Sequence, residues 1–581
     1  MTKTSSADQA DKLDDPISRR KLMLALASGA IGAAALVASK PLPEVKALTV
    51  SGNPDYVEFI EGTAPSTPAL GRLRVWGSST DKMPYITDDG GVTTVAVTRQ
   101  DAAYIIEQIG ATYYARPAPN SGLTAYSGMG DLAPIFDSAV NALISAGGGK
   151  ILIRHGTYNW STAKKYTSSV PIQIEGESWG TIITQPNSTN LERLLTLSAC
   201  QYWTIRNIQW NGNKANNSGG YYGIVLDGSL DCTVEQCWIH DFPSAAINTG
   251  DLGGGALTQR VNILRNLLTN NGGSYTNGYG LFLANFNEGK ILGNTVIGGP
   301  AGFNTGIMVH PTTVNCTGNI IAENSVWDNG ARTEVGIEIG GGTGVPYTST
   351  GNVMSNNRVL LTYALASGES VFGLEFFNAS NNNVMNGNTV TFTNGLSGSS
   401  NGIHIDKDGG SASDLNVISG NNITGAAQGI YLVAADYTNV IGNVLSGCTY
   451  PIYIGGGSTN SNNLILGNSL HSNTYPISDA GTGTIIKDNQ GYNPRGAIAN
   501  PYPTNAGYLS DATAAQAFPT SNTNYTVSGS PKLITVSGGT VTSISIDGTA
   551  TGLTSGAFTL QPGQVLNVIW SAQPSGVVYA C

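Results

Sequence analysis

A short element that recurs at nearly constant spacing through the middle of the chain is the strongest constraint on its fold. Each copy has an aliphatic pair, one or two small polar residues, an asparagine, one more residue and an aliphatic residue. The asparagines are Asn266, Asn294, Asn324, Asn357, Asn388, Asn421, Asn443 and Asn468, and Cys237 takes this place in an earlier copy. Intervals of roughly 22 to 33 residues match one coil of a solenoid.

The chemistry of asparagine explains its place in this repeat. A buried turn leaves backbone N–H and C=O groups without strand partners, and an amide side chain can both donate to and accept from them. Asparagines stacked coil upon coil can also bond to one another. We therefore interpret the repeated asparagines as a structural ladder and not as a catalytic feature.

A second element precedes each asparagine strand, and it has the form glycine, aliphatic, variable, aliphatic. Examples are "GIEI" from Gly336, "GLEF" from Gly373 and "GIHI" from Gly402. Because side chains alternate along a strand, the second and fourth positions should fill the core while the third points outward. The predicted outward row is Val225, Asn248, Phe282, Met308, Glu338, Glu375, His404, Tyr431 and Tyr453. On this basis Glu375 should be exposed on the surface.

The domain organisation follows from where the repeat begins and ends. Residues 48–130 read as a small N-terminal β module that ends in a short helical pattern, "RQDAAYIIEQIG". Residues 131–505 form the solenoid, opened by an apolar stripe at helical spacing that stops at Gly147. Residues 506–581 alternate apolar and polar residues between turns, which is typical of a small antiparallel β domain.

The N-terminal 47 residues predict export. The stretch "SRRKLM" (18–23) precedes a short, Gly/Ala-rich apolar stretch, and two adjacent arginines there resemble a twin-arginine signal. The protein should therefore be secreted or displayed at the cell surface. A single N-terminal membrane anchor is the alternative, and no other segment could span a membrane.

The start of the solenoid resembles a known superfamily. A helix, a glycine run, a strand over 151–154 and then Gly156-Thr157-Tyr158 resemble the entrance of the pectate-lyase-like superfamily. The resemblance covers residues 131–500 and implies an all-β, right-handed single-stranded parallel β-helix capped by a helix. The polygalacturonase signatures Asn-Thr-Asp, Asp-Asp, Gly-His-Gly and Arg-Ile-Lys are missing. The nearest stretches are "NTGD" (248–251) and "GIHID" (402–406), so the resemblance carries the fold but no activity.

If successive coils are in register, the outward row becomes a candidate site. Glu338 and Glu375 then lie about 4.8 Å apart and His404 follows. We expect Glu338 and Glu375 to serve as the acid and the nucleophile or base, while His404 positions or relays protons. The residues expected to bind substrate are Tyr431 and Tyr453 in the same row, with His310 and Asp406 one position further out.

Several readings of this row remain open. Carboxyls at this separation suit a retaining glycosidase, but Asp406 and Asp408 could instead hold calcium if the protein is a lyase. No other cofactor or metal site is expected. An ordinary solvated face is a further alternative, and it would suit a non-catalytic glycan-binding or adhesin-like surface protein. The terminal modules resemble those of tailspikes, so a homotrimer is conceivable in either case.

Charge and cysteine content narrow the choice of partners. The net charge is −10, with no basic cluster beyond the N-terminus, which gives a phosphate backbone nothing to bind. We therefore expect no nucleic acid partner and favour an extracellular polysaccharide. Of the six cysteines, only Cys232 and Cys237 lie close in sequence, so we interpret the set as small core residues with at most one disulfide.

Overall fold

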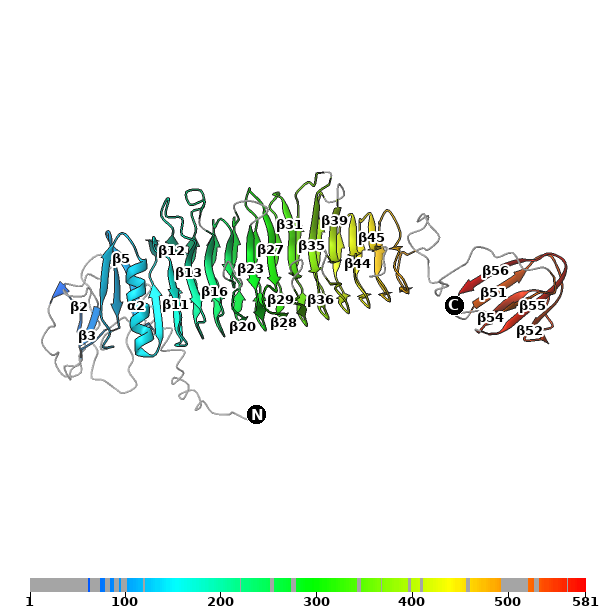
Figure 1. The fold of residues 1–581 in the computed structure, drawn as a ribbon, viewed down its shortest axis with the longest axis horizontal. Helices are drawn as coiled ribbons and strands as arrows, with labels where there is room; N and C mark the ends of the chain where they lie inside the picture. Colours follow the sequence, from blue (N-terminus) through cyan, green and yellow to red (C-terminus); the bar gives the residue numbers. More distant parts are fainter. Residues whose placement is uncertain are drawn as a thin grey trace, which may run out of the picture. The chain divides into compact units, whose positions relative to one another are not determined.

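The computed structural model describes three parts of the chain (Figure 1). Only the backbone is described for the N-terminal strands β1 (Glu61–Gly62), β2 (Arg74–Ser78), β3 (Pro84–Thr87) and β4 (Thr93–Val95), which form one sheet. The second part is residues 102–492 without 119–120, 220, 251–254, 273–277, 342–345, 367, 395–398, 408–410 and 456–459. The third is residues 521–580 without 527–531 and 562. The predicted export signal lies outside the described residues.

Most described residues belong to a parallel β-solenoid in which each full coil contributes one strand to each of three sheets. This confirms the predicted fold class. The first sheet contains β10 (Lys164–Tyr166), β13 (Arg193–Ser198), β16 (Tyr222–Asp227), β19 (Ala245–Asn248), β23 (Tyr279–Ala284), β27 (Phe303–His310), β31 (Thr333–Gly340), β35 (Ser370–Phe377), β39 (Ser399–Asp406), β42 (Gln428–Leu432), β45 (Tyr450–Ile454) and β48 (Ser478–Asp479). These strands stack in chain order (Figure 1).

The other two long sheets complete each coil. The second sheet contains β7 (Tyr126–Met129), β6 (Thr112–Pro117), β5 (Tyr104–Ile109), β8 (Gly149–Ile153), β11 (Ile172–Gly176), β14 (Thr204–Arg206), β17 (Thr233–Glu235), β21 (Asn262–Leu264), β25 (Lys290–Leu292), β29 (Ile320–Ala322), β33 (Val353–Ser355), β37 (Val384–Asn386), β40 (Val417–Ser419), β43 (Asn439–Ile441), β46 (Leu464–Leu466) and β49 (Ile485–Lys487). The third contains β9 (Gly156–Asn159), β12 (Thr181–Thr184), β15 (Gln209–Asn211), β18 (Trp238–His240), β22 (Leu267–Thr269), β26 (Thr295–Ile297), β30 (Ser325–Trp327), β34 (Arg358–Leu361), β38 (Thr389–Phe392), β41 (Asn422–Thr424), β44 (Val444–Ser446) and β47 (Ser469–His471).

Shorter elements accompany the solenoid. Helix α2 (Ala133–Ala146) buries Ile135, Val140 and Leu143, as its apolar stripe predicted, and ends at Gly147 in the left-handed conformation. Two small parallel sheets, β20 (Thr258–Gln259) with β24 (Phe286–Asn287), and β28 (Cys316–Thr317) with β32 (Ser349–Thr350) and β36 (Ser380–Asn381), join further coils. The short helix predicted around 99–110 is wrong, because residues 104–109 form β5 and pair in parallel with β8.

The C-terminal part is an antiparallel β domain, also as predicted. One sheet holds β50 (Asn524–Thr526), β55 (Val565–Ala572), β52 (Thr540–Ile546) and β53 (Thr549–Ala550), and the other holds β54 (Gly556–Leu560), β51 (Lys532–Ser537) and β56 (Ser575–Ala580). Apolar side chains of both sheets, among them Ile534, Ile544 and Phe558, form a core of their own. The exact domain boundaries remain predictions.

The asparagine ladder is present at the corner between the second and third sheets. In one step, the backbone N–H and the Nδ2 of Asn324 both donate to Oδ1 of Asn357 at 3.0 Å, and Asn324 Nδ2 also donates to the carbonyl of Ile291 at 2.8 Å. The same bonds repeat from Asn266 to Asn468, and the ladder extends to Asn489. Cys237 begins it, since its N–H donates to Asn266 Oδ1.

A residue in the left-handed conformation precedes each ladder position and turns the chain. Gly387 has a φ of 67° before Asn388, and Glu323 has a φ of 59° before Asn324. Glycine adopts this conformation without the steric cost that a side chain incurs. The amide of the following asparagine then satisfies the backbone groups that the turn leaves unpaired, which fixes each coil on the next.

Replacing one ladder residue should therefore weaken the whole solenoid. Asn357→Ala removes the acceptor of Asn324 and the donor to the Ile321 carbonyl, so several buried groups lose their partner. We expect the free energy of unfolding to fall by about 2–4 kcal/mol, at about 1–3 kcal/mol for each unsatisfied group. Urea unfolding followed by circular dichroism measures this change.

The matched control is Asn422→Ala, which removes an exposed asparagine in β41. We expect it to change the free energy by less than about 0.5 kcal/mol. Equal effects of the two substitutions would contradict a stabilising role for the ladder.

Candidate functional site

The predicted outward row exists in the first sheet, in the expected order. Glu338 of β31 is the register partner of Glu375 in β35, and Glu375 is the partner of His404 in β39. Beyond them His404 pairs with Tyr431, and Tyr431 with Tyr453. Register partners in adjacent strands lie about 4.8 Å apart, so the two carboxyl-bearing residues are direct neighbours. The roles proposed for these residues remain predictions.

The prediction that Glu375 is exposed is wrong. Glu375 and His404 are each 4% exposed and Glu338 is 6% exposed. The reason lies in the neighbouring glycine. A Cβ on Gly373 would lie 2.4 Å from Cγ1 of Val390 on the third sheet, so Gly373 faces the interior, as does Leu374. Two consecutive inward residues bend the strand, and the side chains before and after them lean together on the outer face.

Contacts across the bend support this geometry. The ring of Phe372 stacks on that of His404, with centroids 4.3 Å apart and planes at 5°. Thr305 of β27 likewise contacts Glu338 of the next strand, with the Oγ1 of Thr305 3.5 Å from the Oε2 of Glu338. A flanking row of side chains thus accompanies the outward row, and its register partners in chain order are Tyr279, Thr305, Val335, Phe372, Asn401, Gln428 and Tyr450. The flanking row contacts Glu338 through Thr305 and covers His404 through Phe372.

Burial and neighbouring carboxylates raise the pKa of both glutamates well above the usual range. Burial raises the pKa of Glu338 well above its usual range, and the neighbouring Glu375 raises it further. Burial also raises the pKa of Glu375, with Asp406 and Glu334 adding to the effect. Two adjacent buried carboxylates cannot both ionise cheaply, so the ionisation of one of them disfavours that of the other.

His404 links this pair toward the surface. Its Nδ1 lies 2.8 Å from Oε1 of Glu375, and its Nε2 lies 3.8 Å from Oδ2 of Asp406. Burial lowers the pKa of His404 to about 4, although Asp406 opposes this shift. Asp406 is more exposed than the other three. The side chains of Asp406, His404 and Glu375 therefore form one line from the more exposed Asp406 to the buried Glu375, whose register neighbour is Glu338.

His310 is not part of this line. It pairs with Ala284 in β23, its ring lies over Phe282 with centroids 6.3 Å apart, and its Nδ1 has no hydrogen-bond partner among the described residues. Burial lowers its pKa to about 4. Two strands, β31 and β35, separate it from Asp406 in the sheet. The structure thus does not bring together the two residues predicted to lie one position further out.

Aromatic side chains continue the row beyond His404. Ring centroids are 5.4 Å apart from His404 to Tyr431 and 5.1 Å from Tyr431 to Tyr453. Tyr450 of the flanking row adds contacts of 5.4 Å to Tyr453 and 4.8 Å to Tyr475. Sequence reasoning missed Tyr450 and Tyr475. The aromatic residue directly before the repeated inward pair, as in "YPIY" (450–453), is the signal that could have found Tyr450.

The cysteines do not form a reactive or metal-binding site in the described part of the chain. Cys200, Cys232, Cys237, Cys316 and Cys448 are buried free thiols, and burial raises the pKa of each. The calcium hypothesis is untested, because Asp408 lies outside the described residues. The described residues contain no helix long and apolar enough to cross a membrane.

Comparisons with known proteins match parts of this architecture. Residues 347–507 match a family model described as periplasmic copper-binding protein (NosD). None of the curated proteins compared matches this chain. Copper binding requires clustered ligands, and no group of three or more His, Cys, Asp or Glu side chains in the described residues is arranged to hold a metal ion. The described residues thus offer no donor set that fits copper.

Three solved structures illustrate the structural similarities. The A-module of mannuronan C-5 epimerase AlgE4 from Azotobacter vinelandii is 16% identical, with 62% of this chain and 96% of that chain covered and a TM-score of 0.47. A tailspike mutant of E. coli bacteriophage HK620 in complex with a hexasaccharide is 12% identical, with 78% of this chain and 89% of that chain covered and a TM-score of 0.45. The Dettilon tailspike protein is 13% identical, with 78% of this chain and 90% of that chain covered and a TM-score of 0.44. Identities this low say nothing about activity.

The raised pKa of Glu338 has a consequence for stability. The folded protein binds this proton more tightly than the unfolded chain does. The contribution of this proton to the stability of the folded protein is thus complete below the unfolded pKa of about 4.3. It is lost as the pH rises toward the raised pKa of the folded state. Glu338→Gln is neutral at every pH, so its melting temperature should exceed that of the wild type at about pH 7 and match it near pH 4.

Thermal unfolding at the two pH values tests this expectation. His404 contributes an opposite dependence between 6.5 and about 4, but both proteins contain it, so the comparison removes it. As a control, Glu323→Gln replaces an exposed corner carboxylate and should change the melting temperature at neither pH. If the wild type were more stable than Glu338→Gln at about pH 7, the raised pKa of Glu338 would be contradicted.

Proposed function

We propose that this chain is an exported protein that binds an extracellular polysaccharide along the first sheet and cleaves its glycosidic bonds. The observation that carries the proposal is the pair Glu338 and Glu375, two buried register neighbours of which one bonds His404. The leader around residues 18–23 and the match to a family described as periplasmic support export.

The pair supplies both groups that glycoside cleavage requires. One carboxyl keeps its proton at neutral pH and can donate it to the glycosidic oxygen as the C–O bond breaks. The other, once ionised, attacks the anomeric carbon and forms a glycosyl ester that water then hydrolyses. Register neighbours lie about 4.8 Å apart at the backbone, which is compatible with the roughly 5 Å between the two carboxyls of retaining enzymes, where no water fits between carboxyl and sugar.

His404 and Asp406 would connect the acid–base carboxyl to solvent and set its protonation between turnovers. Water attacking the ester must lose a proton to the carboxyl that acted first as the acid. The 2.8 Å bond from Glu375 to His404 and the proximity of Asp406 provide a path between that carboxyl and solvent. His404 is thus a positioning and relay residue.

The aromatic row would bind the sugar rings next to this pair. Pyranose rings present apolar faces that stack on aromatic side chains, and Tyr431, Tyr453 and Tyr450 follow His404 at successive contacts near 5 Å. Phe372 covers His404, so substrate entry requires this flanking side chain to swing away.

Glycan binding without cleavage is the second candidate function. It is favoured by the low exposure of Glu338, Glu375 and His404, compared with the half-buried tyrosines. A lyase that uses calcium near Asp406 would differ in its product, which carries an unsaturated sugar. The length and end groups of the glycan after incubation separate these functions from hydrolysis.

The decisive variant is Glu375→Gln, assayed on a panel of extracellular polysaccharides. We expect the wild type to shorten one of them and release reducing ends, and Glu375→Gln to lose at least about a hundredfold in rate, since it removes an acid–base group. Chain length is measured by size-exclusion chromatography and reducing ends by a colorimetric assay.

Glu323→Gln serves as the control and should keep the wild-type rate, because Glu323 is an exposed corner residue. A glycan that is retained but unchanged by the wild type would establish the binding function instead. Undiminished cleavage by Glu375→Gln would remove the proposed catalytic pair.

A further inference from the structure

A second surface feature lies at the corner between the second and third sheets, away from the Glu338 and Glu375 pair. Three successive coils turn there through Asn207, Gln236 and Arg265, each in the left-handed conformation with φ between 52° and 58°. Several later coils have glycine at the same corner, as at Gly387 and Gly420. Two amides and a guanidinium are therefore lined up across neighbouring coils at a backbone cost.

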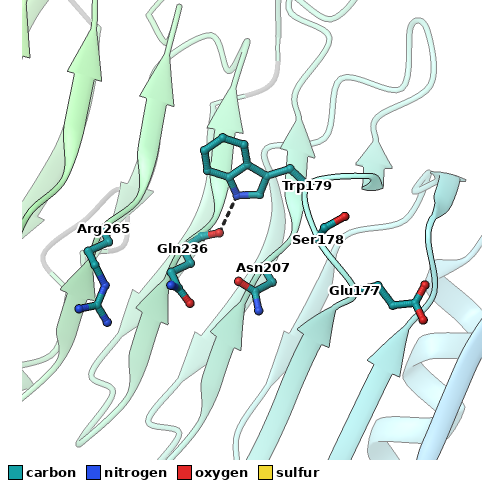
Figure 2. Close-up of a pocket in the computed structure, with 6 residues that line it drawn as sticks. All are labelled: Glu177, Ser178, Trp179, Asn207, Gln236 and Arg265. Atoms are coloured by element: carbon teal, nitrogen blue, oxygen red, sulfur yellow. Dashed lines mark hydrogen bonds between the residues drawn. The ribbon is translucent and has the colours of Figure 1, made fainter. Parts of the chain in front are cut away.

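Trp179 reaches over this row from the loop that follows β11. Its Nε1 donates to the carbonyl of Gln236 at 2.7 Å, and its ring contacts that of Trp238 with centroids 6.0 Å apart. The side chain is nevertheless 42% exposed. Figure 2 shows the hydrogen bond that holds the indole over Gln236.

These residues enclose an open pocket of about 450 Å³. Its lining consists of Glu177, Ser178, Trp179, Asn207, Gln236 and Arg265 (Figure 2). The volume falls within the range of about 300–1,000 Å³ that small-ligand sites occupy. One aromatic side chain and several convergent polar groups supply the contacts that orient a ligand in such a site.

The charges around the pocket leave one cation available. Along the second sheet Lys150 and Arg206 both bind Glu175, at 2.6 and 2.9 Å, and Glu235 lies between Arg206 at 3.8 Å and Arg265 at 3.4 Å. Arg265 ends this series, and its side chain is 64% exposed. Three cations alternate with two carboxylates, so the series carries one net positive charge and ends at Arg265 beside the pocket.

The only carboxylate that lines the pocket is already engaged. Glu177 Oε1 accepts from Nη1 of Arg154 at 2.6 Å, and its Oε2 accepts from the N–H of His155 at 2.9 Å. This pairing neutralises its charge and directs it away from a ligand. The pocket therefore offers an apolar ring face, two amides and one guanidinium.

We infer that this pocket binds one acidic sugar unit of a polysaccharide. The sugar ring would stack on Trp179, its carboxylate would pair with Arg265, and its hydroxyls would bond the amides of Asn207 and Gln236. A single available cation suits one carboxylate and is too little for a run of phosphates. The site lies on other sheets than the proposed catalytic pair, so it would anchor a chain independently of cleavage.

Calorimetric titration with uronate tetramers tests the inference. The probes are oligomannuronate, oligoguluronate and oligogalacturonate, each compared with its carboxyl-reduced, neutral counterpart. The protein carries Tyr431→Ala and Tyr453→Ala, so the aromatic row of the first sheet does not contribute. We expect binding of at least one uronate tetramer, weakened at least tenfold by added Trp179→Ala and three- to tenfold by Arg265→Gln. Added salt should weaken binding less in Arg265→Gln.

Trp327→Ala is the matched control, because Trp327 is an exposed tryptophan of the third sheet outside the pocket. It should leave the affinity unchanged, and circular dichroism should show that all variants remain folded. Binding that survives Trp179→Ala, neutral tetramers that bind as tightly as the acidic ones, or no binding of any tetramer would overturn the inference. Loss of cleavage in Glu375→Gln does not bear on it, since that result concerns the first sheet only.

Discussion

The hydrogen bonds between asparagines of successive coils are the interaction on which the rest of the structure depends. Each ladder residue both donates to and accepts from its neighbours, from Asn266 to Asn489, so no coil can shift relative to the next without breaking several buried bonds. A fixed register places residues separated by about one coil of sequence next to each other. The neighbourhood of Glu338, Glu375 and His404 is a direct result of this register.

The bend at each inward pair converts that register into a chemical environment. Gly373 and Leu374 both face the core, so the outer face folds inward and Phe372 comes to lie on His404. Without this bend Glu375 would be a solvated surface carboxylate with no reason to hold its proton. Glycine is required at the first position of the pair, because the backbone passes too close to Val390 for a side chain.

Much of the fold and the order of the outward row could be predicted from the sequence, for identifiable reasons. Spacing alone gave the coil period, the order of the row and the replacement of asparagine by Cys237, since register follows from periodicity. The burial of Glu375 could not be predicted, because strict alternation assumes a flat strand. A second ladder through Asn319, Asn352 and Asn383 was hidden among other asparagines. The strand at 104–109 depends on its partner β8, and Trp179 stands in a loop without periodicity.

The central claim is that Glu338 and Glu375 form one buried pair in which the pKa of each carboxyl is raised well above its usual range. Infrared difference spectroscopy during a pH titration observes the C=O stretch of protonated carboxyl groups and tests this claim most directly. The account predicts a protonated carboxyl signal that persists at neutral pH and is changed by substituting either glutamate with glutamine. A neutral-pH spectrum without protonated carboxyls, or two signals that respond independently to the two substitutions, would contradict it.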